Sequence, residues 1–219
     1  MAEPERHEMI ERYSANVRTN HWIVAALFVL AALSGLALFH PALYWLSALF
    51  GGGPWTRILH PVVGVLMVAA FVFLAAAVFK DNLLDARDRQ WLRRFGDVLR
   101  NREEDLPEVG RYNAGQKLLF FVLVVALAGL LVSGIVIWRQ YFSALFPIGA
   151  VRFASLAHAF LAFVLIVAII VHVYAAIWVK GSMHAMLRGR VSAGWAYKHH
   201  RAWFRERLSH AADSRARPD

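Results

Sequence analysis

Four long apolar stretches without a single Asp, Glu, Lys or Arg are the feature that most constrains this chain of 219 residues. They cover residues 22–39, 61–79, 118–138 and 153–179. A helix of about 20 apolar residues crosses the hydrocarbon core of a bilayer, and each stretch has roughly that length. The sequence therefore predicts an all-α integral membrane protein with a four-transmembrane-helix bundle.

The distribution of the 24 Lys and Arg residues predicts the orientation of the helices. Segments 1–21, 80–117 and 180–219 hold three, nine and nine of them, whereas 40–60 and 139–157 hold one and two. By the positive-inside rule the first three segments face the cytoplasm, so both termini are expected there. The net charge of +9 reflects this bias and contact with anionic lipid, and it requires no nucleic-acid partner.

Three parts follow from this arrangement: a cytoplasmic N-terminal segment 1–20, a membrane domain 21–180 and a basic cytoplasmic tail 181–219. The aromatic stretch 41–50 and the glycines after it predict a short interfacial helix and a turn outside the membrane. Between spans 2 and 3, apolar residues at helical spacing among arginines predict an interfacial amphipathic helix that ends before Pro107.

The chain contains no cysteine, which excludes disulfides, thiolate catalysis, iron–sulfur clusters and covalently attached c-type haem. Any redox cofactor must therefore be held by histidine and non-covalently. The length leaves little room for a separate soluble domain, so chemistry on a soluble substrate would require another subunit.

Four histidines lie in or beside the apolar stretches, and topology sorts them into two pairs. With both termini inside, His21 and His172 lie near the cytoplasmic ends of their spans, and His60 and His158 lie near the outer ends. His158 and His172 are separated by about 21 Å of helical rise and point within roughly 40° of the same face. The expected pairs are His21 with His172 and His60 with His158.

Two facing imidazoles suit the two axial positions of a haem iron, and a porphyrin fits between the helices of a bundle. The sequence thus predicts two non-covalent b haems whose six-coordinate irons pass electrons and do not bind oxygen. Zinc is the alternative metal, but each depth offers only two ligands and no nearby Cys, Asp or Glu. A haem-free membrane scaffold with packed polar histidines is a further alternative.

Other residues of the spans have simpler interpretations. Gly35 and Gly64 could let a porphyrin edge approach the backbone, although a glycine in a membrane helix more often serves ordinary close packing. The remaining six histidines are interpreted as solvated or interfacial: His7, His40, His184, His199, His200 and His210.

A polar segment, residues 111–117, leads into the third span from the cytoplasmic side. Asn113 and Gln116 bring amide groups to the depth of the inner haem, and Gly115 leaves space for a flat ligand. Such a cluster could hold a quinone carbonyl by hydrogen bonds. The alternative is an N-cap for the third span, with Asn113 capping and Lys117 at the headgroups. Composition alone does not separate the two.

Together these residues resemble the gamma subunit of respiratory formate dehydrogenase, a membrane cytochrome b within a wider group that includes hydrogenase cytochromes b. The resemblance covers about residues 8–205, and the Tyr-Asn-Ala-Gly-Gln-Lys string favours the formate dehydrogenase branch. It rests on four motifs: Arg12-Tyr13 with Asn20-His21-Trp22, Arg57-Ile58-Leu59-His60-Pro61, Arg111-Tyr112-Asn113-Ala114-Gly115-Gln116-Lys117, and the pair His158 and His172.

The resemblance implies that His60 and His158 ligate the periplasmic haem and that His21 and His172 ligate the cytoplasmic haem. It implies a menaquinone site lined by Asn113, Gly115 and Gln116 beside the inner haem and therefore next to His172. Electrons would cross from the outer to the inner haem and reduce menaquinone with cytoplasmic protons. No side chain of this chain is expected to break a bond in formate.

The resemblance further implies a multi-pass protein of the bacterial inner membrane that acts in anaerobic respiration. Its expected partners are an iron–sulfur beta subunit and a catalytic alpha subunit with molybdenum or tungsten. The resemblance leaves open whether three such heterotrimers assemble into a trimer. Two alternatives keep the haem histidines: a cytochrome b of a hydrogenase or another dehydrogenase, and a free-standing di-haem superoxide:quinone oxidoreductase.

Overall fold

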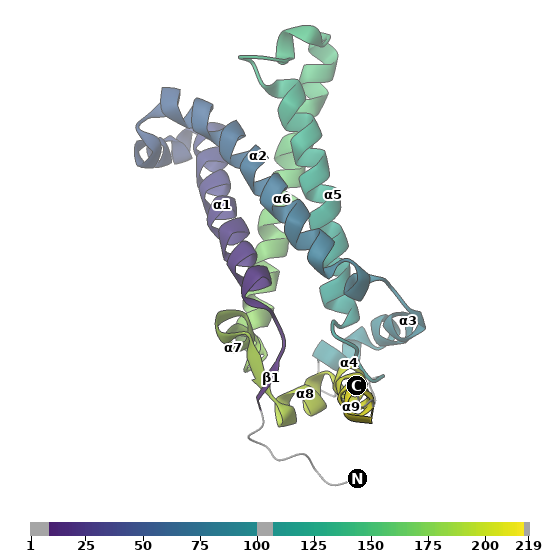
Figure 1. Cartoon of the computed structure of the whole chain (residues 1–219). Coiled ribbons are helices and arrows are strands. Elements are labelled where there is room, and N and C mark those ends of the chain that lie inside the picture. The colour runs from purple at the N-terminus through teal and green to yellow at the C-terminus, as the bar shows by residue number, and fades with distance from the viewer. Residues whose placement is uncertain (1–8, 100–106, 217–219) are drawn as a thin grey trace. The chain divides into compact units, whose positions relative to one another are not determined.

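The computed structural model describes residues 9–99 and 107–216, which divide into two compact units. The bundle unit comprises Asn16–Ala77 and Phe121–Ala175. The terminal unit comprises Met1–Ala15, Val78–Phe120 and Ala176–Asp219. Figure 1 follows the chain through both units by colour.

Four long helices form the spans: α1 (Ala15–Phe39), α2 (Gly53–Val78), α5 (Ala114–Ile137) and α6 (Ile148–Trp178). Each is long and apolar enough to cross a membrane, so the predicted four-span all-α fold is confirmed. Within the bundle unit, α1 and α2 form one helical hairpin, and α5 and α6 form the other (Figure 1).

The two hairpins differ in their connections. The 3-10 helix η1 (Pro41–Phe50) follows α1, and the side chain of His40 caps it by accepting from the N–H of Ala42. Gly51 and Gly52 then turn the chain with φ of 83° and 93°, a left-handed conformation that favours glycine. The predicted short helix and glycine turn are therefore present. A shorter 3-10 helix, η3 (Ser143–Leu145), lies between α5 and α6.

The core of the bundle unit is a cluster of side chains from α2, α5 and α6. Its buried members are Met67, Phe71, Ala126, Leu127 and Leu165. Leu165 lies on α6 midway between His158 and His172. Apolar packing therefore fills the level between the two histidine depths. The outward faces carry large exposed apolar side chains, as lipid contact requires.

The terminal unit joins the two ends of the chain through a small antiparallel sheet. Strand β1 (Met9–Glu11) pairs with β2 (Arg190–Ser192) in the register Ile10 opposite Val191. Helices α7 (Ser182–Arg188), α8 (Ala193–His199) and α9 (Arg201–Ala216) complete this region. Because a sheet cannot form across a bilayer, this pairing requires both ends of the chain to lie on one side of the membrane.

The segment after α2 folds as η2 (Lys80–Asn82), α3 (Ala86–Arg93) and α4 (Phe95–Leu99). In the described part of this segment, two short helices thus replace the single amphipathic helix expected, and its expected end before Pro107 lies outside the described residues. The last turn of α3 tightens at Arg94, whose N–H donates to the carbonyl of Trp91 at 3.0 Å, and this ends the helix. Asp85 starts α3 with a capping box that includes Asp88.

Candidate functional site

The four candidate haem ligands all belong to the bundle unit, where they form two close pairs. The ring centroids of His21 on α1 and His172 on α6 are 6.2 Å apart. Those of His60 on α2 and His158 on α6 are also 6.2 Å apart. The structure therefore brings together the same pairs that topology predicts, while their ligation of haem stays a prediction.

The spacing within each pair fits two axial ligands of one metal. An imidazole nitrogen bonds a metal at about 2 Å, and adding the distance from nitrogen to ring centre on both sides gives a centroid separation of about 6 Å. The planes of the two rings differ by 51° in the first pair and 75° in the second. Both pairs therefore have room for one metal ion between the rings.

The donor set favours a haem iron over a bare ion. Within residues 9–99 and 107–216, no group of three or more His, Cys, Asp or Glu side chains could hold a metal. Zinc needs about four such ligands, whereas a porphyrin supplies four nitrogens and leaves two axial positions to the protein. In the same described ranges, the buried Nδ1 atom of His21 has no hydrogen-bond partner. The residues thus fit haem and do not fit zinc.

Two serines, Ser34 and Ser133, contact the second pair, and no sequence pattern marks them. Ser34 Oγ lies 3.0 Å from His60 Nδ1, and Ser133 Oγ lies 3.0 Å from His158 Nδ1. Serine in an apolar helix commonly bonds its own backbone, so its presence alone gave no signal of a ligand contact.

The polar segment 111–117 forms the start of α5, and its amides do form a cap. Asn113 Oδ1 accepts from the N–H of Gln116 at 2.9 Å, and Gln116 Oε1 accepts from the N–H of Asn113 at 3.0 Å. This reciprocal arrangement is a capping box. A Cβ on Gly115 would lie 3.3 Å from the Trp91 ring, so this glycine admits an aromatic side chain of α3.

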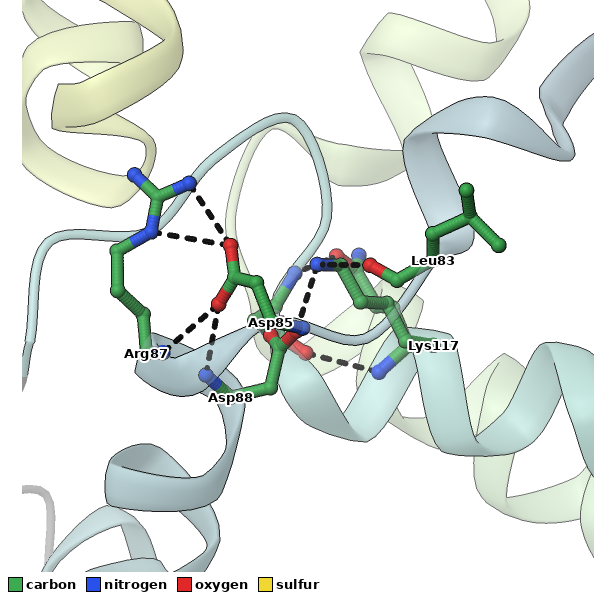
Figure 2. Close-up of polar contacts among 7 residues, drawn as sticks. Leu83, Asp85, Arg87, Asp88 and Lys117 are labelled. Atoms are coloured by element: carbon green, nitrogen blue, oxygen red, sulfur yellow. Dashed lines mark hydrogen bonds and ion pairs between the residues drawn. The ribbon is translucent and has the colours of Figure 1, made fainter.

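Lys117 does not extend to the headgroups as the capping alternative supposed. Its Nζ donates to Asp88 Oδ2 at 2.7 Å and to the carbonyl of Leu83 at 2.9 Å (Figure 2). The side chains of Lys117 and Asp88 are 8% and 7% exposed. The lysine turns toward α3 because a buried carboxylate and the Leu83 carbonyl lie within its reach, so it ties α3 to the start of α5.

The same segment is tied to the N-terminal region by two arginines. Arg12 Nη2 donates to the carbonyl of Arg111 at 2.6 Å, and Arg111 Nη2 donates to the carbonyl of Arg12 at 2.7 Å. The buried guanidinium of Arg12 lies over the rings of Trp203 and Trp195, at 4.9 and 5.2 Å from their centroids. Cation–π contacts thus stabilise this guanidinium, for which the described part of the chain provides no ion pair.

The sequence predicts a solvated or interfacial His200, and the solvated position is wrong. It is buried, its Nδ1 donates to the carbonyl of Gly110 at 2.8 Å, and its Nε2 accepts from Arg12 Nη2 at 3.1 Å. Burial and the positive charge of Arg12 lower the pKa of His200 to about 3, against the opposing hydrogen bond to Gly110. The neutral ring therefore links the junction of α8 and α9 to the segment before α5.

The quinone candidates and the haem candidates lie in different units of the chain. Asn113, Gly115 and Gln116 belong to the terminal unit, and His172 belongs to the bundle unit. The helices α5 and α6 both contain residues of the two units. The Gln116 amide therefore lies on one long helix and the His172 ring on another. The role of the three residues in binding a quinone stays a prediction.

Four apolar spans with facing histidines at two depths define the class of this protein as a membrane-embedded cytochrome b. Residues 12–189 match the prokaryotic cytochrome b561 family, and the chain belongs to that family. It is accordingly a multi-pass protein of the bacterial inner membrane that binds haem b and transfers electrons.

Curated relatives carry more specific names. The chain is 45% identical over 202 residues to the formate dehydrogenase cytochrome b556(fdo) subunit of Escherichia coli K12, covering 92% of this chain and 95% of the relative. It is 42% identical over 201 residues to the nitrate-inducible cytochrome b556(Fdn) subunit of the same strain, covering 92% and 93%. A formate dehydrogenase cytochrome b556 subunit of Haemophilus influenzae is 40% identical over 199 residues, covering 91% and 84%. The resemblance to formate dehydrogenase subunits is confirmed.

Proposed function

We propose that the chain is the di-haem cytochrome b subunit of a membrane-bound formate dehydrogenase and delivers electrons to menaquinone near the cytoplasmic face. The observation that carries this proposal is the presence of two histidine pairs, each with ring centroids 6.2 Å apart, at two depths of one bundle. Relatives whose alignments cover 92% of the chain are named as formate dehydrogenase subunits, which supports formate as the source of the electrons.

Each pair would hold one non-covalent haem b, with His60 and His158 toward the periplasm and His21 and His172 toward the cytoplasm. When bound, each haem takes up and releases one electron at its iron. The side chains around Leu165 exclude water between the two levels, and α6 fixes their separation because it carries one ligand of each pair. The imidazoles and the residues around them would set the reduction potential of each haem.

The capping box at the start of α5 is compatible with quinone binding. It engages only the side-chain oxygens of Asn113 and Gln116. A side-chain amide also carries an NH₂ group with two donors, so the cap fixes both amides while each NH₂ stays available for a quinone carbonyl. Gly115 lies between them with the Trp91 ring against it, so a quinone ring would pack beside that tryptophan.

Electron movement toward the cytoplasm opposes the membrane potential. Each electron moved through the full potential costs about 2.3 kcal/mol per 100 mV. The formate-to-quinone potential drop has to supply this work. The catalytic step would lie on a molybdenum or tungsten alpha subunit, with an iron–sulfur beta subunit between, because this chain has no cysteine for a cluster. A trimer of such heterotrimers is the assembly this proposal includes.

The test uses the intact complex and the purified chain. A pyridine-haemochrome assay with a protein count should give two b haems per chain. Formate added to membranes containing the complete complex should reduce both spectral components, and a menaquinone analogue should reoxidise them. Fewer than two haems would contradict the di-haem proposal. Reduction by a substrate other than formate, with a different catalytic partner co-purified, would contradict the formate assignment.

A further inference from the structure

The direction of the hydrogen bonds at Ser34 and Ser133 can be read from their backbone contacts. Ser34 Oγ also lies 2.7 Å from the carbonyl of Leu30, and Ser133 Oγ lies 2.6 Å from the carbonyl of Gly129. A carbonyl only accepts, and a hydroxyl has a single proton. Each serine therefore donates to its own helix and accepts from the histidine.

This direction fixes the tautomer of both rings. Nδ1 of His60 and of His158 must carry the proton that the serine oxygen accepts. In a neutral imidazole the other nitrogen, Nε2, is then unprotonated and has a free lone pair. That is the nitrogen a metal requires. The two serines thus present His60 and His158 in the same ligand form.

A glycine follows each serine and makes room for the same ring. A Cβ on Gly35 would lie 3.0 Å from His60 Cε1, and a Cβ on Gly134 would lie 3.3 Å from His158 Cε1. Both distances are tighter than ordinary carbon contacts. Each Ser-Gly pair therefore holds one edge of an imidazole by a hydrogen bond and by close approach of the helix backbone.

The arrangement occurs once in each helical hairpin. Ser34 of α1 precedes His60 of α2 by 26 residues, and Ser133 of α5 precedes His158 of α6 by 25 residues. The other pair differs, because the buried Nδ1 of His21 has no hydrogen-bond partner in the described parts of the chain. The hydrogen bonding of the imidazole Nδ1 atoms therefore differs between the two pairs.

We propose that Ser34 and Ser133 are positioning residues that fix His60 and His158 as Nε2 ligands and make the outer haem harder to reduce than the inner one. The inference rests on the proposed di-haem function. A hydrogen bond donated by Nδ1 raises the basicity of the ligand nitrogen, which stabilises the oxidised iron. With the outer haem bound, this difference in potential would favour electron transfer from the outer to the inner level and would offset part of the work against the membrane potential.

The test is a potentiometric titration of the reduced-minus-oxidised spectrum of the purified complex. A His60→Ala variant identifies the outer component by its loss. Ser34→Ala and Ser133→Ala should each raise the ratio of reduced to oxidised outer haem at a fixed applied potential by about threefold, equal to roughly 30 mV for a one-electron couple. The inner component should not move. Ser34→Thr, which keeps a hydroxyl able to bond the helix carbonyl, should restore the original ratio.

Ser155→Ala is the matched control, because Ser155 on α6 makes the same helix bond, 2.9 Å to the carbonyl of Val151, and is exposed. It should leave both midpoints unchanged. Two haems per chain with unchanged midpoints in both serine variants would overturn this inference and leave the di-haem proposal standing. Fewer than two haems in the unmodified chain would instead defeat the proposed function. An equal shift of both components would show a general loosening of the bundle and would also overturn the inference.

Discussion

At the residue scale, the four histidines make the assignment of each haem testable by loss of one spectral component. His60→Ala and His158→Ala should remove the same component, since their rings face each other, and His21→Ala and His172→Ala should remove the other. Each variant should retain about one haem per chain by pyridine haemochrome. His40→Ala is the control, because His40 caps η1 and should leave both components intact. Loss of the same component in His21→Ala and His60→Ala would show that the pairing is wrong.

Gly35 offers a second test at this scale. Gly35→Ala would place a methyl group 3.0 Å from His60 Cε1, so the ring must move and the outer haem should be partly lost. Gly149→Ala on α6 is the matched control, because no atom beyond its chain neighbours and its own helix backbone lies within 4 Å of a Cβ built there. In a helix, replacement of glycine by alanine should raise the free energy of unfolding by about 0.5–1 kcal/mol. Haem content and the thermal midpoint in detergent measure both effects. Full haem content in Gly35→Ala would contradict the close approach of backbone and ring.

The sequence predicts the two histidine pairs better than the residues around them. A histidine in an apolar span is costly and stands out, so the two pairs follow from topology. Ser34, Gly35, Ser133 and Gly134 do not stand out, because small residues are ordinary in membrane helices. Their contact with the rings depends on how α1 meets α2 and how α5 meets α6, which periodicity does not encode. His200 was missed for the same reason, since its burial depends on Arg12, 188 residues away.

At the scale of elements, the N-terminus of α5 combines a cap with the proposed quinone contact, and substitutions can separate the two. Asn113→Ala should cost about 1 kcal/mol of stability through the lost cap. Asn113→Ser should restore the cap, because serine caps as well as asparagine, but it lacks the amide NH₂. Both variants should keep both haems reducible and slow their reoxidation by a quinone by up to about tenfold. Normal reoxidation in Asn113→Ser would leave the segment with a capping role alone.

The ion pair between α3 and α5 should be one of the strongest links in the terminal unit. Lys117→Met leaves the buried Asp88 carboxylate without its cation and should destabilise by about 3–5 kcal/mol. Arg87→Met is the matched control, since its pair with Asp85 is 53% and 37% exposed and should contribute about 1 kcal/mol or less. Thermal unfolding midpoints in detergent compare the two. Equal small shifts would show that α3 is not held by this pair.

The sequence predicts the helices that have a long apolar pattern. It does not predict the elements whose bounds depend on contacts with distant residues. The four spans follow from runs of about 20 apolar residues. The amphipathic segment before α5 has the correct helical character, but its division into α3 and α4 depends on a tightened turn at Arg94. The strands β1 and β2 have three residues each and pair across almost the whole chain, so no local pattern predicts them.

At the scale of the whole molecule, two independent arguments address the side of the termini. An even number of spans and the pairing of β1 with β2 both place the two ends of the chain on one side of the membrane. The excess of Lys and Arg in the segments on that side predicts that it is the cytoplasm. The proposed electron flow from His60 and His158 to His21 and His172 depends on this orientation, because it decides which histidines would face the electron donor.

Because the chain has no cysteine, single introduced thiols report the orientation directly. Tyr141→Cys lies between α5 and α6 at a position 69% exposed, and Leu208→Cys lies on α9 at a position 48% exposed. A membrane-impermeant maleimide applied to right-side-out vesicles should label Tyr141→Cys at once and Leu208→Cys only after the membrane is opened. The unmodified chain should stay unlabelled. Labelling of both variants from the outside would contradict the four-span topology. Labelling of Leu208→Cys alone would invert the orientation, and His21 with His172 would then be the pair that receives electrons.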